Sequence, residues 1–111
     1  LVICNNDGMA VGVVQALNAA GYNNGTGKTI PVFGVDATDD AKALIGQGKM
    51  AGTVKQDAEG MAKAVAQTIK ALGEGKSMVD ALAAAAATGD NFSIASAVSA
   101  KLYVAYAPYT G

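Results

Sequence analysis

Polar side chains follow three apolar stretches of this sequence. Asn5-Asn6-Asp7 comes after the first stretch, Asp36 after the second and Lys55-Gln56-Asp57 after the third. Carboxylates are strong hydrogen-bond acceptors and amides add one acceptor and two donors, so these groups match the hydroxyls of a polyol. They include no nucleophile beside a base and no metal-ligand spacing. The pattern therefore favours recognition of a polyol over catalysis and predicts no metal site.

Each of these polar residues also has a purely structural interpretation. Asp7 is most simply the N-cap of the helix that follows, and for Asn6 stabilisation of the same turn competes with ligand binding. Asp36 is equally suited to capping a turn and to contacting a ligand. Lys55 and Gln56, judged by residue type alone, are better explained as linker residues.

A glycine-rich segment, GYNNGTGKT at residues 21–29, superficially matches a phosphate-binding loop. That motif requires Gly, four residues and then Gly-Lys-Ser/Thr, placed between a strand and a helix. The Gly-Lys-Thr at 27–29 would need glycine at position 22, which is Tyr22, and the residues that follow indicate a strand. The segment is therefore interpreted as a helix C-cap at Gly21 followed by a polar loop.

Composition narrows the classes of function. The 111 residues are 51% hydrophobic with a net charge of −1, which is typical of a globular unit. The absence of His removes the commonest general base and metal ligand, so we expect neither an enzyme nor a cofactor in this chain. We expect no nucleic-acid partner and no membrane span, because the sequence has no basic run and no sufficiently long apolar run.

Apolar periodicity predicts the elements that must position the polar residues. Strands are expected at residues 1–5, 30–35 and 50–54, with helices between them at 9–20 and 39–45. This alternation implies a parallel sheet with right-handed crossovers and helices on its faces. The predicted fold class is α/β with a doubly wound parallel sheet, in which ligands bind at the edge formed by the carboxyl ends of the strands.

The rest of the sequence is less regular. An apolar stripe at residues 58–72 predicts an amphipathic helix that must pack against something. Ser77 starts a capping-box pattern before an alanine-rich segment, which is either a short helix or a linker. Residues 97–106 indicate one more strand. Because the chain begins at Leu1 inside a predicted strand, we expect a fragment of a longer protein.

Three blocks of this sequence resemble the C-terminal part of the periplasmic glucose/galactose-binding proteins and, more loosely, of the ribose-binding proteins. Their order and spacing fit that family, and the final Pro-Tyr-Thr-Gly at 108–111 is similar to a Pro-Tyr-Val-Gly near the family's end. Residues 74–100 align poorly. The three blocks are Cys4-Asn5-Asn6-Asp7-Gly8-Met9-Ala10-Val11-Gly12, Ile30-Pro31-Val32-Phe33-Gly34-Val35-Asp36-Ala37 and Ala51-Gly52-Thr53-Val54-Lys55-Gln56-Asp57.

The resemblance implies a fold like that of the type I periplasmic binding proteins. It implies a two-lobed receptor that closes over one monosaccharide and delivers it to an ABC permease, with a chemoreceptor as a further partner. It also implies that Asn6, Asp36 and Gln56 contact the sugar. The glucose/galactose group has Asn at the position of Gln56 and the ribose group has Gln, so the sugar stays open between a hexose and a pentose.

The resemblance further implies an organisation into lobes. Residues 1–56 would be the last strand-helix units of the C-terminal lobe, 57–100 the segment that crosses to the N-terminal lobe and 101–111 the return strand, near Leu102 to Tyr106. Val54, Lys55 and Asp57 would form a hinge. The calcium loop of the glucose/galactose group would lie upstream of these residues. The expected location is the periplasm, or the outer surface with a lipid anchor in a Gram-positive organism.

Two other interpretations stay open at this point. The effector-binding core of a LacI-type transcriptional repressor shares the two-lobed fold, and an upstream helix-turn-helix would identify it. An upstream signal peptide or lipoprotein cysteine would instead identify a transport receptor. An α/β enzyme that uses Asp36 or Asp57 together with residues outside this sequence is the alternative from another class.

Overall fold

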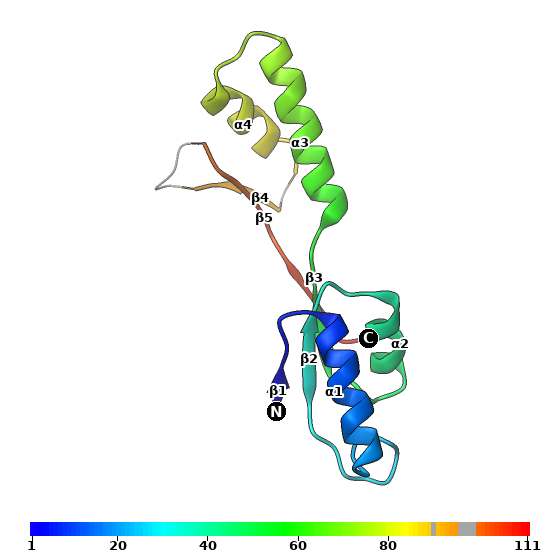
Figure 1. Cartoon of the computed structure of the whole chain (residues 1–111). Helices are drawn as coiled ribbons and strands as arrows, with labels where there is room; N and C mark the ends of the chain where they lie inside the picture. The colour runs from blue at the N-terminus through cyan, green and yellow to red at the C-terminus, as the bar shows by residue number, and fades with distance from the viewer. Residues whose placement is uncertain (90, 96–99) are drawn as a thin grey trace. The chain divides into compact units, whose positions relative to one another are not determined.

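The structure is a computed structural model that describes residues 1–89, 91–95 and 100–111. The chain forms two compact units, which can be followed along the chain in Figure 1. Unit 1 comprises Leu1–Gln56 and Tyr106–Gly111, and unit 2 comprises Asp57–Ala105. The chain therefore leaves unit 1 after Gln56 and returns to it at Tyr106.

Unit 1 is built on a four-stranded sheet in the order β1-β2-β3-β6. β1 (Val2–Ile3), β2 (Val32–Val35) and β3 (Gly52–Lys55) run parallel, and β6 (Ala107–Tyr109) pairs antiparallel with β3. The predicted α/β class and the parallel arrangement of the first three strands are confirmed.

Two helices, α1 (Asp7–Ala19) and α2 (Asp39–Gly46), connect the parallel strands. Because strand order follows chain order from β1 to β3, right-handed crossovers place both helices on the same face of the sheet, as Figure 1 shows. A doubly wound sheet carries helices on both faces, whereas the helices described in unit 1 cover one.

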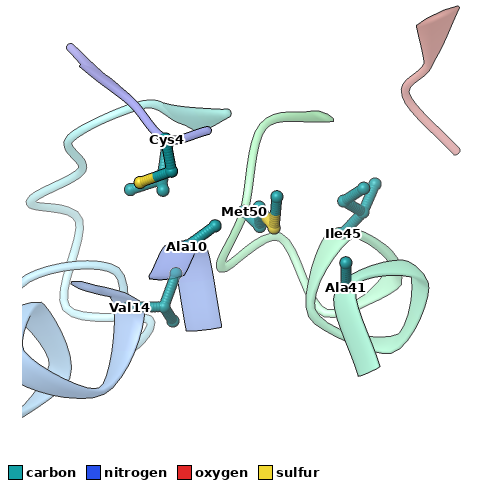
Figure 2. Close-up of a cluster of buried hydrophobic side chains, with 7 residues drawn as sticks. Cys4, Ala10, Val14, Ala41, Ile45 and Met50 are labelled. Atoms are coloured by element: carbon teal, nitrogen blue, oxygen red, sulfur yellow. The ribbon is translucent and has the colours of Figure 1, made fainter. Parts of the chain in front are cut away.

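The core of unit 1 lies between these two helices and the sheet. Ala10 and Ala41 are completely buried, and their small side chains allow the helices to approach the strands closely. Cys4, at the end of the apolar run Leu1-Val2-Ile3-Cys4, is a free and buried thiol. Figure 2 draws the buried cluster as sticks: Cys4, Ala10, Val14, Val32, Ala41, Ile45 and Met50.

The other face of the sheet is apolar too. Parallel register places Ile3 beside Phe33, and Val35 beside Val54. Ile3 is 76% exposed. Unit 1 therefore presents an apolar sheet face that its described helices do not cover.

The segment at residues 21–29 begins with the predicted helix C-cap. Gly21 has a φ of 84° and donates its N–H to the carbonyl of Asn18, while Tyr22 donates to the carbonyl of Leu17. This is the hydrogen-bond pattern of a Schellman motif, which needs a residue that tolerates positive φ at Gly21. The segment leads into β2 instead of a helix, so it lacks the context of a phosphate-binding loop.

Asn23 organises this loop from a buried position. Its Nδ2 donates to the carbonyls of Ile30 (2.8 Å) and Lys49 (3.0 Å), and its Oδ1 accepts from the N–H of Ile30 (2.7 Å). One side chain thus satisfies backbone groups on the approaches to both β2 and β3, which would otherwise be unpaired.

Unit 2 contains α3 (Ala58–Gly73), α4 (Met78–Ala86) and the antiparallel pair β4 (Phe92–Ile94) and β5 (Leu102–Val104). Ser77 caps α4, since its side chain accepts from the N–H of Asp80 at 3.2 Å. This capping favours the helix over the linker that the sequence left open.

The end of the chain differs from the sequence-based prediction. The predicted strand at 97–106 corresponds to β5, whereas residues 97–99 lie outside the described part of the chain. β5 pairs with β4 inside unit 2, because these two strands are close in sequence and form a local antiparallel pair. The strand that joins the sheet of unit 1 is β6. It contains Pro108, which an edge strand tolerates.

Replacement of Asn23 tests the anchoring of the loop. We expect Asn23→Ala to lower the free energy of unfolding by about 2–3 kcal/mol, because buried backbone groups at Ile30 and Lys49 lose their partner. Urea denaturation followed by circular dichroism measures this change. The matched control is Asn24→Ala on the exposed side of the loop, with an expected change below about 0.5 kcal/mol. Equal effects of the two substitutions would contradict the anchoring role.

Candidate functional site

The carboxyl ends of β1, β2 and β3 meet at one edge of the sheet because these strands are parallel neighbours. Asn6, Asp36 and Gln56 each follow one of these strands. Their positions directly after parallel strands predict that all three lie at this edge. The strand order places them there, at the position where open α/β sheets bind ligands.

Asp36 and Gln56 touch each other. Gln56 Nε2 donates to Asp36 Oδ1 at 2.6 Å, although the two residues are twenty positions apart. Tyr106 lies on the other side of Gln56, and its hydroxyl donates to Gln56 Oε1 at 3.4 Å. The three side chains form a polar row of acceptor, amide and hydroxyl.

This row is accessible to solvent. Asp36 is exposed and Gln56 is half-buried, so both can reach solvent. Asp36 Oδ2 and the second hydrogen of the Gln56 amide are suited to a hydroxyl that both donates and accepts. The row can therefore bind a polyol without any chemical step.

Asn6 is the N-cap of α1. Its Oδ1 accepts from the N–H of Met9 at 2.9 Å. The sequence favoured Asp7 as the N-cap, and that prediction was wrong, because Asp7 is already the first residue of the helix. The Asn6 amide nitrogen extends from a half-buried side chain at the sheet edge.

Asp7 is completely buried and makes tertiary hydrogen bonds. Its Oδ1 accepts from the hydroxyl of Thr53 at 2.6 Å, and its Oδ2 accepts from the N–H (2.7 Å) and hydroxyl (3.2 Å) of Thr38. Burial of a carboxylate is costly unless such partners satisfy it. Gly34 makes room for it, because a Cβ there would overlap Asp7 Oδ1.

The predicted hinge residues lie where the chain changes unit. Val54 and Lys55 belong to β3 in unit 1, and Asp57 is the first residue of unit 2. Asp57 is the N-cap of α3. It accepts from the N–H of Gly60 at 3.0 Å and from Asn91 Nδ2 at 2.7 Å. The hinge role of Val54, Lys55 and Asp57 stays a prediction.

An apolar hollow lies elsewhere, in unit 2. It has a volume of about 360 Å³ and an almost wholly apolar lining. Met61, Val65 and Ile69 of α3 contribute to it and are themselves exposed. A sugar needs matched polar groups, so this hollow does not suit a polyol. The α3 residues that line this hollow belong to the apolar stripe that the sequence predicted on this helix.

Residues 1–89, 91–95 and 100–111 contain no group of three or more His, Cys, Asp or Glu side chains that could hold a metal ion. None of the helices in the same residues is both long and apolar enough to cross a bilayer.

Tyr106 and the buried position of Asp7 were not identified from the sequence. Tyr106 was assigned to a strand, and its contact with Gln56 spans fifty residues. A short-range pattern carries no signal for such a contact. The partners of Asp7, which are Thr38 and Thr53, are likewise distant in sequence.

Comparison with known proteins gives consistent matches. Residues 1–77 match the model of a periplasmic binding protein domain. The chain is 44% identical over 80 residues to the D-galactose/methyl-galactoside binding periplasmic protein MglB of Haemophilus influenzae, covering 72% of this chain and 22% of that protein. It is 40% identical over 77 residues to a candidate rhizopine-binding protein of Rhizobium meliloti, covering 69% and 24%. The chain thus spans about a quarter of these relatives.

Replacement of Gly60 tests the cap at the start of unit 2. A methyl group at this position would overlap the Asp57 carboxylate. We expect Gly60→Ala to lower the free energy of unfolding by about 1–3 kcal/mol in a denaturation experiment. The control is Gly73→Ala in the same helix, where a Cβ meets nothing within 4 Å. That change should be neutral or stabilising by up to about 1 kcal/mol, and a similar loss in both variants would argue against the cap.

Proposed function

This chain belongs to the periplasmic binding protein family, and from that premise we propose that it is part of a receptor that binds one monosaccharide outside the cytoplasm. Unit 1 supplies one side of the sugar site. The intact receptor holds the sugar between two lobes and passes it to an ABC permease, without altering it chemically. The galactose named for the Haemophilus relative supports a hexose or a related pentose as the class of ligand.

One observation carries this proposal. The Asp36 carboxylate and the Gln56 amide lie in contact at the ligand-binding edge of a parallel sheet. A carboxylate accepts strong hydrogen bonds from sugar hydroxyls. An adjacent amide can donate to the oxygens of these hydroxyls or accept from a neighbouring hydroxyl of the sugar. Asn6 follows the neighbouring strand and adds a third polar side chain at the same edge.

The choice between sugars depends on Gln56. Its amide is shared between Asp36 and the hydroxyl of Tyr106. The side chain of Gln is longer than that of Asn, so its amide reaches further from the backbone, to Asp36 and Tyr106. We propose that this row sets the ligand preference among glucose, galactose, ribose and related sugars.

Binding drives closure of the receptor in this proposal. The unliganded receptor samples open forms, and a sugar that contacts both lobes favours the closed form by its additional contacts there. The chain passes from unit 1 to unit 2 at Gln56 and Asp57, and Val54, Lys55 and Asp57 act in the hinge. The closed form is the one that the permease, and a chemoreceptor where present, recognises. The receptor works in the periplasm or, with a lipid anchor, on the outer surface.

Replacement of Asp36 tests the sugar site. In the intact receptor we expect Asp36→Asn to weaken sugar binding by about 10- to 150-fold, because hydrogen bonds to a charged acceptor contribute about 1.5–3 kcal/mol. Isothermal titration calorimetry with glucose, galactose, ribose, xylose and arabinose measures the effect. Asp39→Asn is the matched control, since its side chain is fully exposed on α2. Unchanged affinity in Asp36→Asn would refute the site.

The isolated chain provides a second test. We expect the 111-residue chain alone to bind these sugars at least about 100-fold more weakly than the intact receptor, because half of a site loses the contacts of the other half. We also expect the chain to self-associate through its exposed apolar surfaces. Analytical ultracentrifugation and calorimetry check both. A monomer with the affinity of the intact receptor would contradict the two-lobed site.

A further inference from the structure

The loop that presents Asp36 has an unusual backbone. Asp36 has a φ of 117° and Ala37 a φ of 55°, and neither is glycine. Positive φ brings Cβ close to backbone atoms and is disfavoured for such residues. Conformations of this kind persist where surrounding contacts hold them, and they gather at functional sites. The structure must therefore contain groups that hold this loop.

Three consecutive N–H groups of the loop are held by hydrogen bonds. Asp36 N–H donates to the carbonyl of Val54 at 2.8 Å. Ala37 N–H donates to the hydroxyl of Thr53 at 3.3 Å, and Thr38 N–H donates to Asp7 Oδ2 at 2.7 Å. Two of the three contacts involve side chains on other elements.

Asp7 connects these side-chain contacts. Its Oδ1 accepts from the hydroxyl of Thr53 at 2.6 Å, which orients that oxygen to accept from Ala37 N–H. Its Oδ2 accepts from both the N–H and the hydroxyl of Thr38. The carboxylate thus fixes the two residues after Asp36, one directly and one through Thr53. Asp7 is completely buried, so solvent does not compete for these bonds.

We propose that Asp7 is a positioning residue for the sugar site: its hydrogen bonds hold the left-handed backbone at Asp36 and Ala37, from which the Asp36 carboxylate meets Gln56. Asp7 does not touch the ligand in this scheme. The effect of Asp7 on sugar binding rests on the proposed function. Its effect on the conformation of the loop depends on unit 1 alone.

A merely structural role for Asp7 makes a different prediction. A buried hydrogen-bond network that only stabilises the fold would change the melting temperature when it is disturbed. It would leave the loop conformation and the sugar affinity of the folded molecules as they were. A positioning role moves the loop and the affinity even in variants that stay folded.

The first variants change the network while conserving shape. Asp7→Asn keeps the size of the side chain but replaces one acceptor oxygen by a donor, so either the Thr38 N–H or the Thr53 hydroxyl loses the oxygen to which it donates. Thr53→Val keeps the shape but removes the hydroxyl that links Asp7 to Ala37. Thr53→Ser keeps the hydroxyl and serves as the matched control.

Two measurements follow the loop and the ligand separately. In the 111-residue chain, amide exchange of Ala37 and Thr38 should become about tenfold faster in Asp7→Asn and Thr53→Val, but not in Thr53→Ser. The strong intraresidue Hα–HN contacts that positive φ produces at Asp36 and Ala37 should weaken in the same variants. In the intact receptor, the same two substitutions should lower sugar affinity about tenfold by calorimetry.

A glycine provides the rescue. Glycine adopts positive φ without steric cost, so Ala37→Gly reduces the backbone strain that the hydrogen bonds to this loop must offset. Ala37→Gly combined with Asp7→Asn should recover part of the lost affinity, whereas a purely structural defect in the Asp7→Asn protein would persist.

The outcomes separate the two proposals. Faster exchange, lower affinity and rescue by Ala37→Gly support the positioning role. Unchanged amide exchange and unchanged sugar affinity in folded Asp7→Asn overturn it. If Asp7→Asn does not fold, equal exchange rates and equal affinities in Thr53→Val and Thr53→Ser overturn it instead. If the unmodified receptor binds none of the sugars, the proposed function fails, and amide exchange alone still decides whether Asp7 holds the loop.

Discussion

The buried carboxylate of Asp7 is the interaction on which unit 1 depends. It lies at the start of α1 and accepts hydrogen bonds from Thr38, the N-cap of α2, and from Thr53 in β3. A buried carboxylate costs several kcal/mol unless its oxygens are satisfied, so these elements must keep their relative positions. Gly34 belongs to the same arrangement, because only a residue without Cβ leaves space for the carboxylate beside β2.

This constraint links stability to the polar edge of the sheet. The hydrogen bonds that satisfy Asp7 are also those that fix the loop after β2, where Asp36 is exposed toward solvent and meets Gln56. A small unit with short strands gains a rigid edge in this way. Two other surfaces of the chain are exposed and apolar: the sheet face at Ile3 in unit 1 and the stripe of α3 in unit 2. Both surfaces agree with a chain that spans about a quarter of its relatives.

Local physical rules account for the parts of the structure that the sequence predicted. The alternation of apolar strands and amphipathic helices is a short-range pattern, and it predicted the parallel sheet of unit 1. The C-cap at Gly21 and the N-cap at Ser77 were predicted for the same reason, since a cap needs only a few neighbouring residues. Placement of Asn6, Asp36 and Gln56 at one edge followed from topology, because carboxyl ends of parallel strands coincide.

The sequence by itself thus determined the order of the elements of unit 1 and which polar residues follow its strands. The tertiary structure alone decided that Asn6 caps α1 while Asp7 is buried, that Tyr106 meets Gln56, and that β5 pairs with β4 while β6 completes the first sheet. Each of these depends on contacts between residues far apart in the chain or on a choice between two neighbouring residues of similar chemistry. Such contacts leave no periodic signal, because burial and hydrogen-bond partners are set only when the elements pack together.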